Sequence, residues 1–248
     1  GEFRGERAAN GYITAGYLHG THLIMGLFDY GSAHGVAVVP LSEFLGPTNP
    51  ERTLLTSSIA RRPKVYDDYP EFNFFNRSSV AVWQDSMLVG FGGAEDVVTY
   101  TLAGSPVDTT TIPFRLRTGS SKEAMSVFLK PGAPFNTLLK ARSTLKALWR
   151  MPDGVFLLWH QDNWSEPFGT DEQVFGRAFL SILSADRRRA CVDAEVPFPG
   201  SAWPRITAAG DTVYALDQVV PDGDSLGTYS VVRRYLLDTS GCEWLPTK

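Results

Sequence analysis

The chain has 248 residues, of which 43% are hydrophobic and 12% aromatic, and it contains 23 glycines and 16 prolines. Its formal net charge of −4 argues against nucleic-acid binding, because that function depends on a basic field. No apolar run approaches the roughly 20 residues needed to cross a bilayer, so we expect no transmembrane segment. Frequent glycine and proline favour short strands joined by tight turns.

Four segments, in chain order, share a pattern of a short apolar strand, a polar turn and a second apolar strand. They span residues 11–28, 78–93, 145–160 and 204–218. Each pair precedes a third strand-like run, at 34–43, 96–104, 176–186 and 229–239, and then a fourth, at 52–60, 107–115, 190–198 and 242–246. Apolar and polar residues alternate in "VVTYTL" and "VDTTTI", as expected for strands with one solvated face.

A four-stranded meander repeated in tandem predicts an all-β fold of the β-propeller class. We expect a single propeller domain over residues 1–248, with blades at roughly 11–60, 78–115, 145–198 and 204–246. The period of roughly 60–70 residues exceeds the 40–50 that are typical of one blade, and long connections account for the difference. One such connection carries a short helical pattern at 120–129.

The two cysteines occupy equivalent places in the repeat. Cys191 and Cys242 each start the predicted outermost strand of a blade, in consecutive blades. Outer strands of neighbouring blades splay apart, whereas a disulfide requires Cα atoms within about 7 Å of each other. The repeat therefore predicts two free thiols.

Several blade motifs carry a family resemblance. "RMPDGVFLLWH", "ACVDAEVPFPG", "GDTVYALDQ" and "VVRRYLLD" resemble segments of uncharacterised bacterial six-bladed β-propeller proteins related to the NHL and TolB-type propellers. Members of that family are typically exported, frequently as lipoproteins, which implies an extracytoplasmic location, periplasmic or secreted. Only four blades are recognisable here, so the family pattern implies either missing N-terminal blades, which we favour, or a ring that closes with fewer.

A first candidate site lies at the end of the third repeat. His160 and Asp162 are two residues apart on a predicted strand and therefore share a face, which permits an Asp-oriented histidine base. Trp159 and Trp164 flank this pair and are suited to stacking on a sugar. The alternative is a polar loop beside tryptophans that pack the blade.

The long connection at 61–75 is the second candidate. Its carboxylates could act as general acid and nucleophile on a glycoside, and its cations and aromatics could bind a ligand. The carboxylates are Asp67, Asp68 and Glu71, and the proposed ligand-binding residues are Arg61, Arg62 and Tyr66. An inter-blade linker that packs its aromatic residues onto the blades explains the same composition.

The sequence thus predicts a propeller that binds a small molecule, a glycan or a protein partner at its channel face. The alternatives are a propeller hydrolase or lyase acting on a sugar or ester, and a structural module that meets a protein partner through an open propeller edge. No motif identifies a cofactor, and we predict no metal site.

Overall fold

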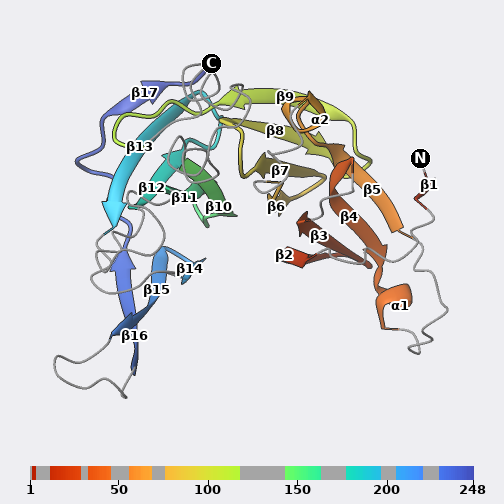
Figure 1. Cartoon of the computed structure of the whole chain (residues 1–248), viewed down its shortest axis with the longest axis horizontal. Coiled ribbons are helices and arrows are strands. Elements are labelled where there is room, and N and C mark those ends of the chain that lie inside the picture. The colour runs from red at the N-terminus through yellow and green to blue at the C-terminus, as the bar shows by residue number, and fades with distance from the viewer. Residues whose placement is uncertain are drawn as a thin grey trace, which may run out of the picture. The chain divides into compact units, whose positions relative to one another are not determined.

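The computed structural model describes residues 2–3, 12–28, 33–45, 56–68, 76–117, 143–162, 177–196, 205–219 and 229–248. It is an all-β structure of four antiparallel sheets, and the predicted fold class of propeller-type blades is confirmed (Figure 1). The chain forms two compact units. The first comprises Gly1–Thr111 with Leu145–Leu148, and the second comprises Ile112–Thr144 with Trp149–Lys248.

The first two sheets lie in the first unit, and their strands follow chain order apart from β1. The first sheet has the order β1-β5-β4-β3-β2, with β1 at Glu2–Phe3, β2 at Tyr12–His19, β3 at His22–Phe28, β4 at His34–Pro40 and β5 at Thr56–Arg61. The second has the order β6-β7-β8-β9, at Ser78–Trp83, Ser86–Phe91, Asp96–Thr101 and Pro106–Thr111. Two single-turn helices, α1 at Leu41–Phe44 and α2 at Val65–Asp68, lie in the connections.

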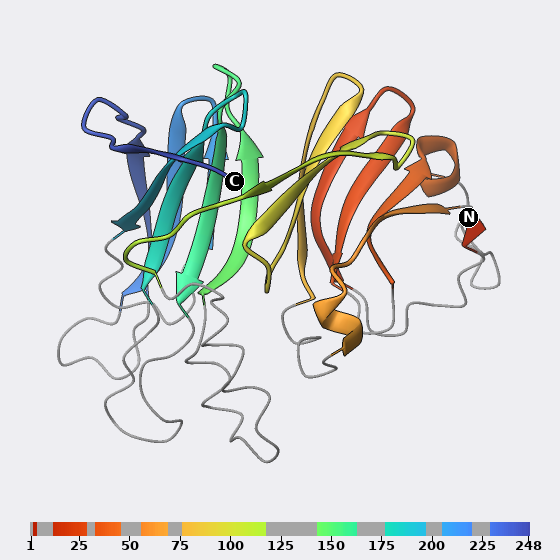
Figure 2. The same cartoon turned by 90° about the horizontal axis from the view of Figure 1, so that it is seen from above.

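The other two sheets differ from the expected four-stranded meander. The third has the order β10-β11-β12-β13-β17, at Ser143–Arg150, Phe156–Asp162, Ala178–Leu183, Arg189–Val196 and Trp244–Pro246. The fourth contains only β14, β15 and β16, at Arg205–Ala209, Thr212–Val219 and Tyr229–Leu236. The predicted outer strand of the fourth blade, 242–246, instead pairs with β13 as β17, so that expectation was wrong (Figure 2).

The middle strands are buried on both faces. Val89 and Leu88 in β7, and Leu157 and Leu158 in β11, have no exposed surface although neighbouring side chains of a strand point to opposite sides. The sequences of such strands are rich in consecutive apolar residues, because packing covers both faces of the sheet. No helix within the described ranges is long and apolar enough to span a membrane. The predicted helix at 120–129 lies outside the described residues.

Close packing of the first two sheets depends on a serine and a glycine. The Ser78 hydroxyl accepts a hydrogen bond from the Leu27 N–H at 2.8 Å and lies within donating distance of the Leu27 and Gly35 carbonyls. A Cβ on Gly35 would lie 2.5 Å from Cε1 of Phe91, so no larger residue fits there without movement of the ring. The two sheets therefore meet through polar contacts in a space without room for another side chain.

Candidate functional site

The end of β11 brings several polar side chains together in the second unit. His160 and Asp162 lie in β11, and β12 begins beside them because His160 pairs with Phe179. β10 also begins at this end, where the Ser143 hydroxyl donates a hydrogen bond to an Asp162 oxygen. Tight turns lie at the opposite end of the sheet, as at Gly154 between β10 and β11. We call the group of His160, Asp162, Arg177, Phe179 and Glu195 the β11-end cluster.

His160 is buried, with 3% of its surface exposed. Burial lowers the pKa of its imidazole well below 6.5, and the positive charge of Arg117 lowers it further. Among the described residues, Nδ1 of His160 has no hydrogen-bond partner. The ring is therefore neutral at pH 7 and holds an unused hydrogen-bonding nitrogen in the interior.

Asp162 is held by groups other than His160. Its Oδ1 accepts the Ser143 hydroxyl, its Oδ2 accepts Nη2 of Arg177 at 3.1 Å, and its backbone N–H donates to the Arg177 carbonyl at 2.9 Å. An effective general base has a pKa near the working pH and is commonly oriented by a carboxylate. The low pKa of His160 and the engagement of Asp162 favour a binding role for this pair over proton transfer.

Arg177 is the cation of the β11-end cluster, and its side chain is accessible to solvent. Its side chain is 48% exposed, and its guanidinium lies 5.0 Å from the centre of the Phe179 ring. Nη2 also donates to the Leu116 carbonyl at 2.9 Å, while Nη1 lies 4.0 Å from Glu195. These contacts fix the plane of the guanidinium while half of the side chain faces solvent, an arrangement suited to ligand oxygens.

A buried ion pair positions a chain segment that contacts the β11-end cluster. Arg117 Nε donates to Oδ1 of Asp193 at 2.9 Å, and both side chains are almost fully buried. Oδ2 of Asp193 accepts the backbone N–H groups of Arg115, Leu116 and Arg117. Asp193 thereby holds the segment that supplies the Leu116 carbonyl to Arg177.

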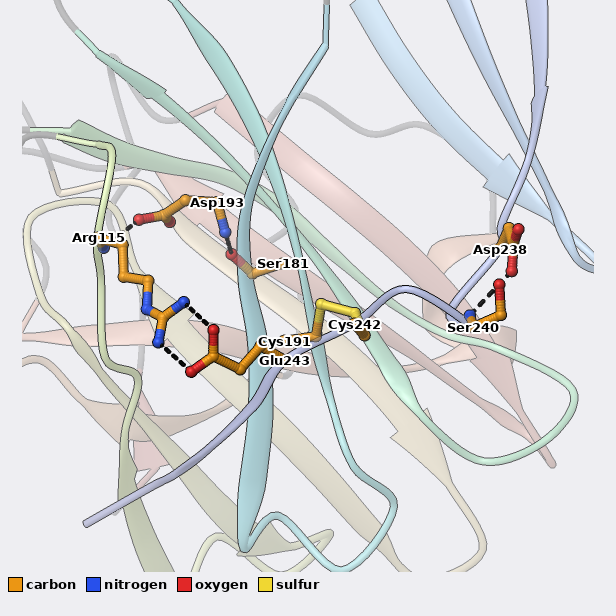
Figure 3. The surroundings of a disulfide bond; sticks show 8 residues. All are labelled: Arg115, Ser181, Cys191, Asp193, Asp238, Ser240, Cys242 and Glu243. Atoms are coloured by element: carbon orange, nitrogen blue, oxygen red, sulfur yellow. Dashed lines mark hydrogen bonds and ion pairs between the residues drawn. A yellow bond between two sulfur atoms is a disulfide. The ribbon is translucent and has the colours of Figure 1, made fainter.

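Asp193 owes its position to a bulge in β13. Val192 and Asp193 together lie opposite Ser181 of β12, and Asp193 has a φ of 60°. Its backbone N–H donates to the Ser181 hydroxyl at 3.1 Å (Figure 3). Aspartate tolerates this left-handed conformation better than most residues. The sequence patterns did not predict a role for Arg117, Asp193 or Arg177. The available signal was a charged residue inside the strand-like run "CVDAEV".

The two cysteines of the chain form a disulfide within the second unit, so the prediction of free thiols was wrong. Cys191 and Cys242 form a disulfide with a Cα–Cα distance of 5.7 Å (Figure 3). The prediction placed Cys242 in the fourth blade, but β17 pairs with β13 and aligns Trp244 with Cys191. The same segment is tied to Arg115, whose two terminal nitrogens donate to Glu243 at 2.7 and 2.6 Å.

The residues predicted around 61–75 lie in the first unit. Arg62 donates to Oδ1 of Asp67 at 3.0 and 3.2 Å, and Arg61 lies 3.7 Å from Oδ2. Tyr66 is 1% exposed, and its hydroxyl oxygen accepts the Gly93 N–H at 2.8 Å. Tyr66 therefore anchors α2 to the second sheet, while Arg61, Arg62 and Asp67 form an ion-pair group at the surface.

The remaining predicted residues give less information. Trp159 is 8% exposed, and its Nε1 has no hydrogen-bond partner in the described part of the chain. Glu71, Trp164 and the side chain of Asp68 lie outside the described residues. Within the described residues, no group of three or more His, Cys, Asp or Glu side chains is placed to hold a metal ion.

Comparisons with known proteins show a structural likeness but no match in sequence. No family model and no curated protein matches the sequence. Among solved structures, the chain is similar to a member of the duf4221 family from Bacteroides vulgatus ATCC 8482, with a TM-score of 0.48 and 12% sequence identity. The match covers 90% of this chain and 63% of that chain, so the present chain spans less than two thirds of its length. No residue role is transferred from that structure.

Proposed function

We propose that this chain is an exported β-propeller protein that binds a small polar molecule or glycan at the β11-end cluster. The observation that carries the proposal is the placement of Arg177. It is half exposed, stacked on Phe179 and held by Asp162, beside the buried and neutral His160. A prearranged donor next to an aromatic ring suits the hydroxyl and carboxylate oxygens of sugars. The quoted blade motifs support a relation to the six-bladed NHL and TolB-type propellers.

Binding is favoured over hydrolysis because the described residues of the cluster supply recognition groups, and their histidine is a poor base. A histidine whose pKa lies well below 6.5 accepts a proton poorly at neutral pH. The same neutral ring can exchange one hydrogen bond with a ligand without a change of charge. The cluster thus offers directional contacts of the kind that hold a polar molecule.

Substitution of Arg177 tests this proposal. A panel of neutral and acidic oligosaccharides is screened by thermal shift, and each ligand that responds is titrated by calorimetry. We expect Arg177→Ala to weaken binding about tenfold or more, because charge-assisted hydrogen bonds are lost. Arg150→Ala is the matched control, since Arg150 is an exposed arginine at the tight-turn end of the same sheet. Absence of any ligand, or an equal loss in both variants, would refute the proposal.

The disulfide supports an extracytoplasmic location. Disulfides persist in oxidising compartments such as the periplasm and are rare in the bacterial cytosol. We expect the native protein, recovered after immediate trapping of free thiols in its source cells, to carry no alkyl group on Cys191 or Cys242 and to fractionate outside the cytoplasm. Alkylation of both cysteines in a cytoplasmic fraction would contradict this location.

A further inference from the structure

Two cations lie close together in the first unit and belong to neither of the predicted sites. Arg77 directly precedes β6, and Lys146 lies in β10 within the part assigned to this unit. The Ser79 hydroxyl donates to the Lys146 carbonyl at 3.3 Å, which places β6 against this part of β10. Gly92 connects the two segments: its N–H donates to the Arg77 carbonyl at 2.7 Å, and its carbonyl accepts the Leu145 N–H at 3.0 Å.

Both cationic groups are largely removed from water. Burial, together with the nearby positive charge of Arg77, lowers the pKa of the Lys146 ammonium to about 8. Burial also lowers the pKa of Arg77, and its Nε is a buried donor without a hydrogen-bond partner among the described residues. Charge repulsion and desolvation therefore act on the pair in the same direction.

The strands that pack against β6 contain no acidic residue; they are β2, β3, β4 and β7. β7, the strand next to β6, contains no charged residue. Asp96, the first residue of β8, accepts the Thr111 hydroxyl at 2.5 Å, and the preceding Glu95 has an interaction of its own. Within the described ranges, neither Arg77 nor Lys146 takes part in an ion pair with an acidic side chain.

We propose that Arg77 and Lys146 form a binding site for a small oxyanion, a phosphate or carboxylate group. An arginine fork and a lysine point charge are the usual protein partners of such groups. A bound anion would compensate both buried charges at once and would satisfy the unused Nε donor. The site shares no residue with the β11-end cluster, so each proposal can be tested and can fail without the other.

The test uses inorganic phosphate and glucuronate as probes, with ionic strength held constant by chloride. At about pH 6.5, where Lys146 is protonated, we expect each binding anion to raise the melting temperature of the chain in a saturable manner. A response to phosphate alone indicates a phosphoryl ligand, and a stronger response to glucuronate indicates a sugar acid. Lys146→Met should abolish the response, whereas the exposed control Arg150→Met should retain it.

The pH dependence separates this site from general salt effects. Above about pH 8 the apparent affinity of the wild type for the anion should fall about tenfold per pH unit, because the ammonium loses its proton. Lys146→Arg should keep its response over the same range, since a guanidinium stays charged. In chloride alone, Lys146→Met should melt at a higher temperature than the wild type, because a buried repulsion is removed. No response to either anion, or an unchanged response in Lys146→Met, would overturn the proposal.

Discussion

Replacement of Cys242 by serine is expected to lower the free energy of unfolding by about 2–4 kcal/mol. The disulfide joins residues separated by 51 positions and so restricts the unfolded chain over a long loop. It also holds β17 on β13, where only three residue pairs are in register. The measurement is the urea midpoint with and without a phosphine reductant. The reduced wild type should match the variant, which itself should not respond to the reductant.

A control in the same segment distinguishes the covalent bond from the neighbouring contacts. Arg115 and Glu243 form a bidentate ion pair, but their side chains are 43% and 70% exposed. Solvent screens such a pair, so Glu243→Gln should leave the urea midpoint nearly unchanged. Hydrogen exchange at Leu245 should accelerate in the cysteine variant but not in Glu243→Gln. A midpoint that does not move when both thiols are released would contradict a stabilising role for the disulfide.

Replacement of Asp193 by asparagine is expected to cost about 3–5 kcal/mol of unfolding free energy. The substitution removes a carboxylate that is paired with the buried Arg117 and that accepts three backbone N–H groups. Asparagine has the same shape and also tolerates a positive φ, so backbone strain does not confuse the result. Chemical unfolding monitored by circular dichroism measures the loss.

A surface ion pair serves as the comparison for this experiment, and a double variant tests whether the unpaired arginine causes the loss. Asp67→Asn breaks the partly exposed pair with Arg62 and should cost only about 0–1 kcal/mol. Arg117→Met combined with Asp193→Asn should recover part of the loss, because no arginine is then buried beside an amide. If Asp193→Asn costs no more than Asp67→Asn, the buried pair does not hold the 112–117 segment in place.

The strands of this protein could be predicted because their signal is local. Apolar runs and period-two alternation reflect burial of strand faces, and tight turns such as that at Gly154 mark the hairpins. All four first hairpins and all four third strands lie where the repeat predicts them. The predicted pairing of the outer strand in the last repeat was wrong, because the three residues of β17 do not indicate which sheet edge they join.

The candidate site was predictable only in part. His160 and Asp162 do share one end of a strand, as period-two geometry requires. Their roles depend on partners distant in sequence: Arg117 acts on His160, while Ser143 and Arg177 hold Asp162. Sequence spacing could indicate that an Asp-oriented histidine was permitted, but not that the aspartate was already engaged.

The sequence by itself determined the all-β class and the blade hairpins, because burial of strand faces produces apolar runs and apolar–polar alternation in neighbouring residues. Only the tertiary structure decided which edge receives the final strand, and with it that Cys191 and Cys242 meet. It also decided that Arg117 and Asp193 are buried together, and that Lys146 lies near Arg77. These outcomes depend on contacts between residues 51 to 76 positions apart, whose charge and burial are set by the fold and not by local sequence.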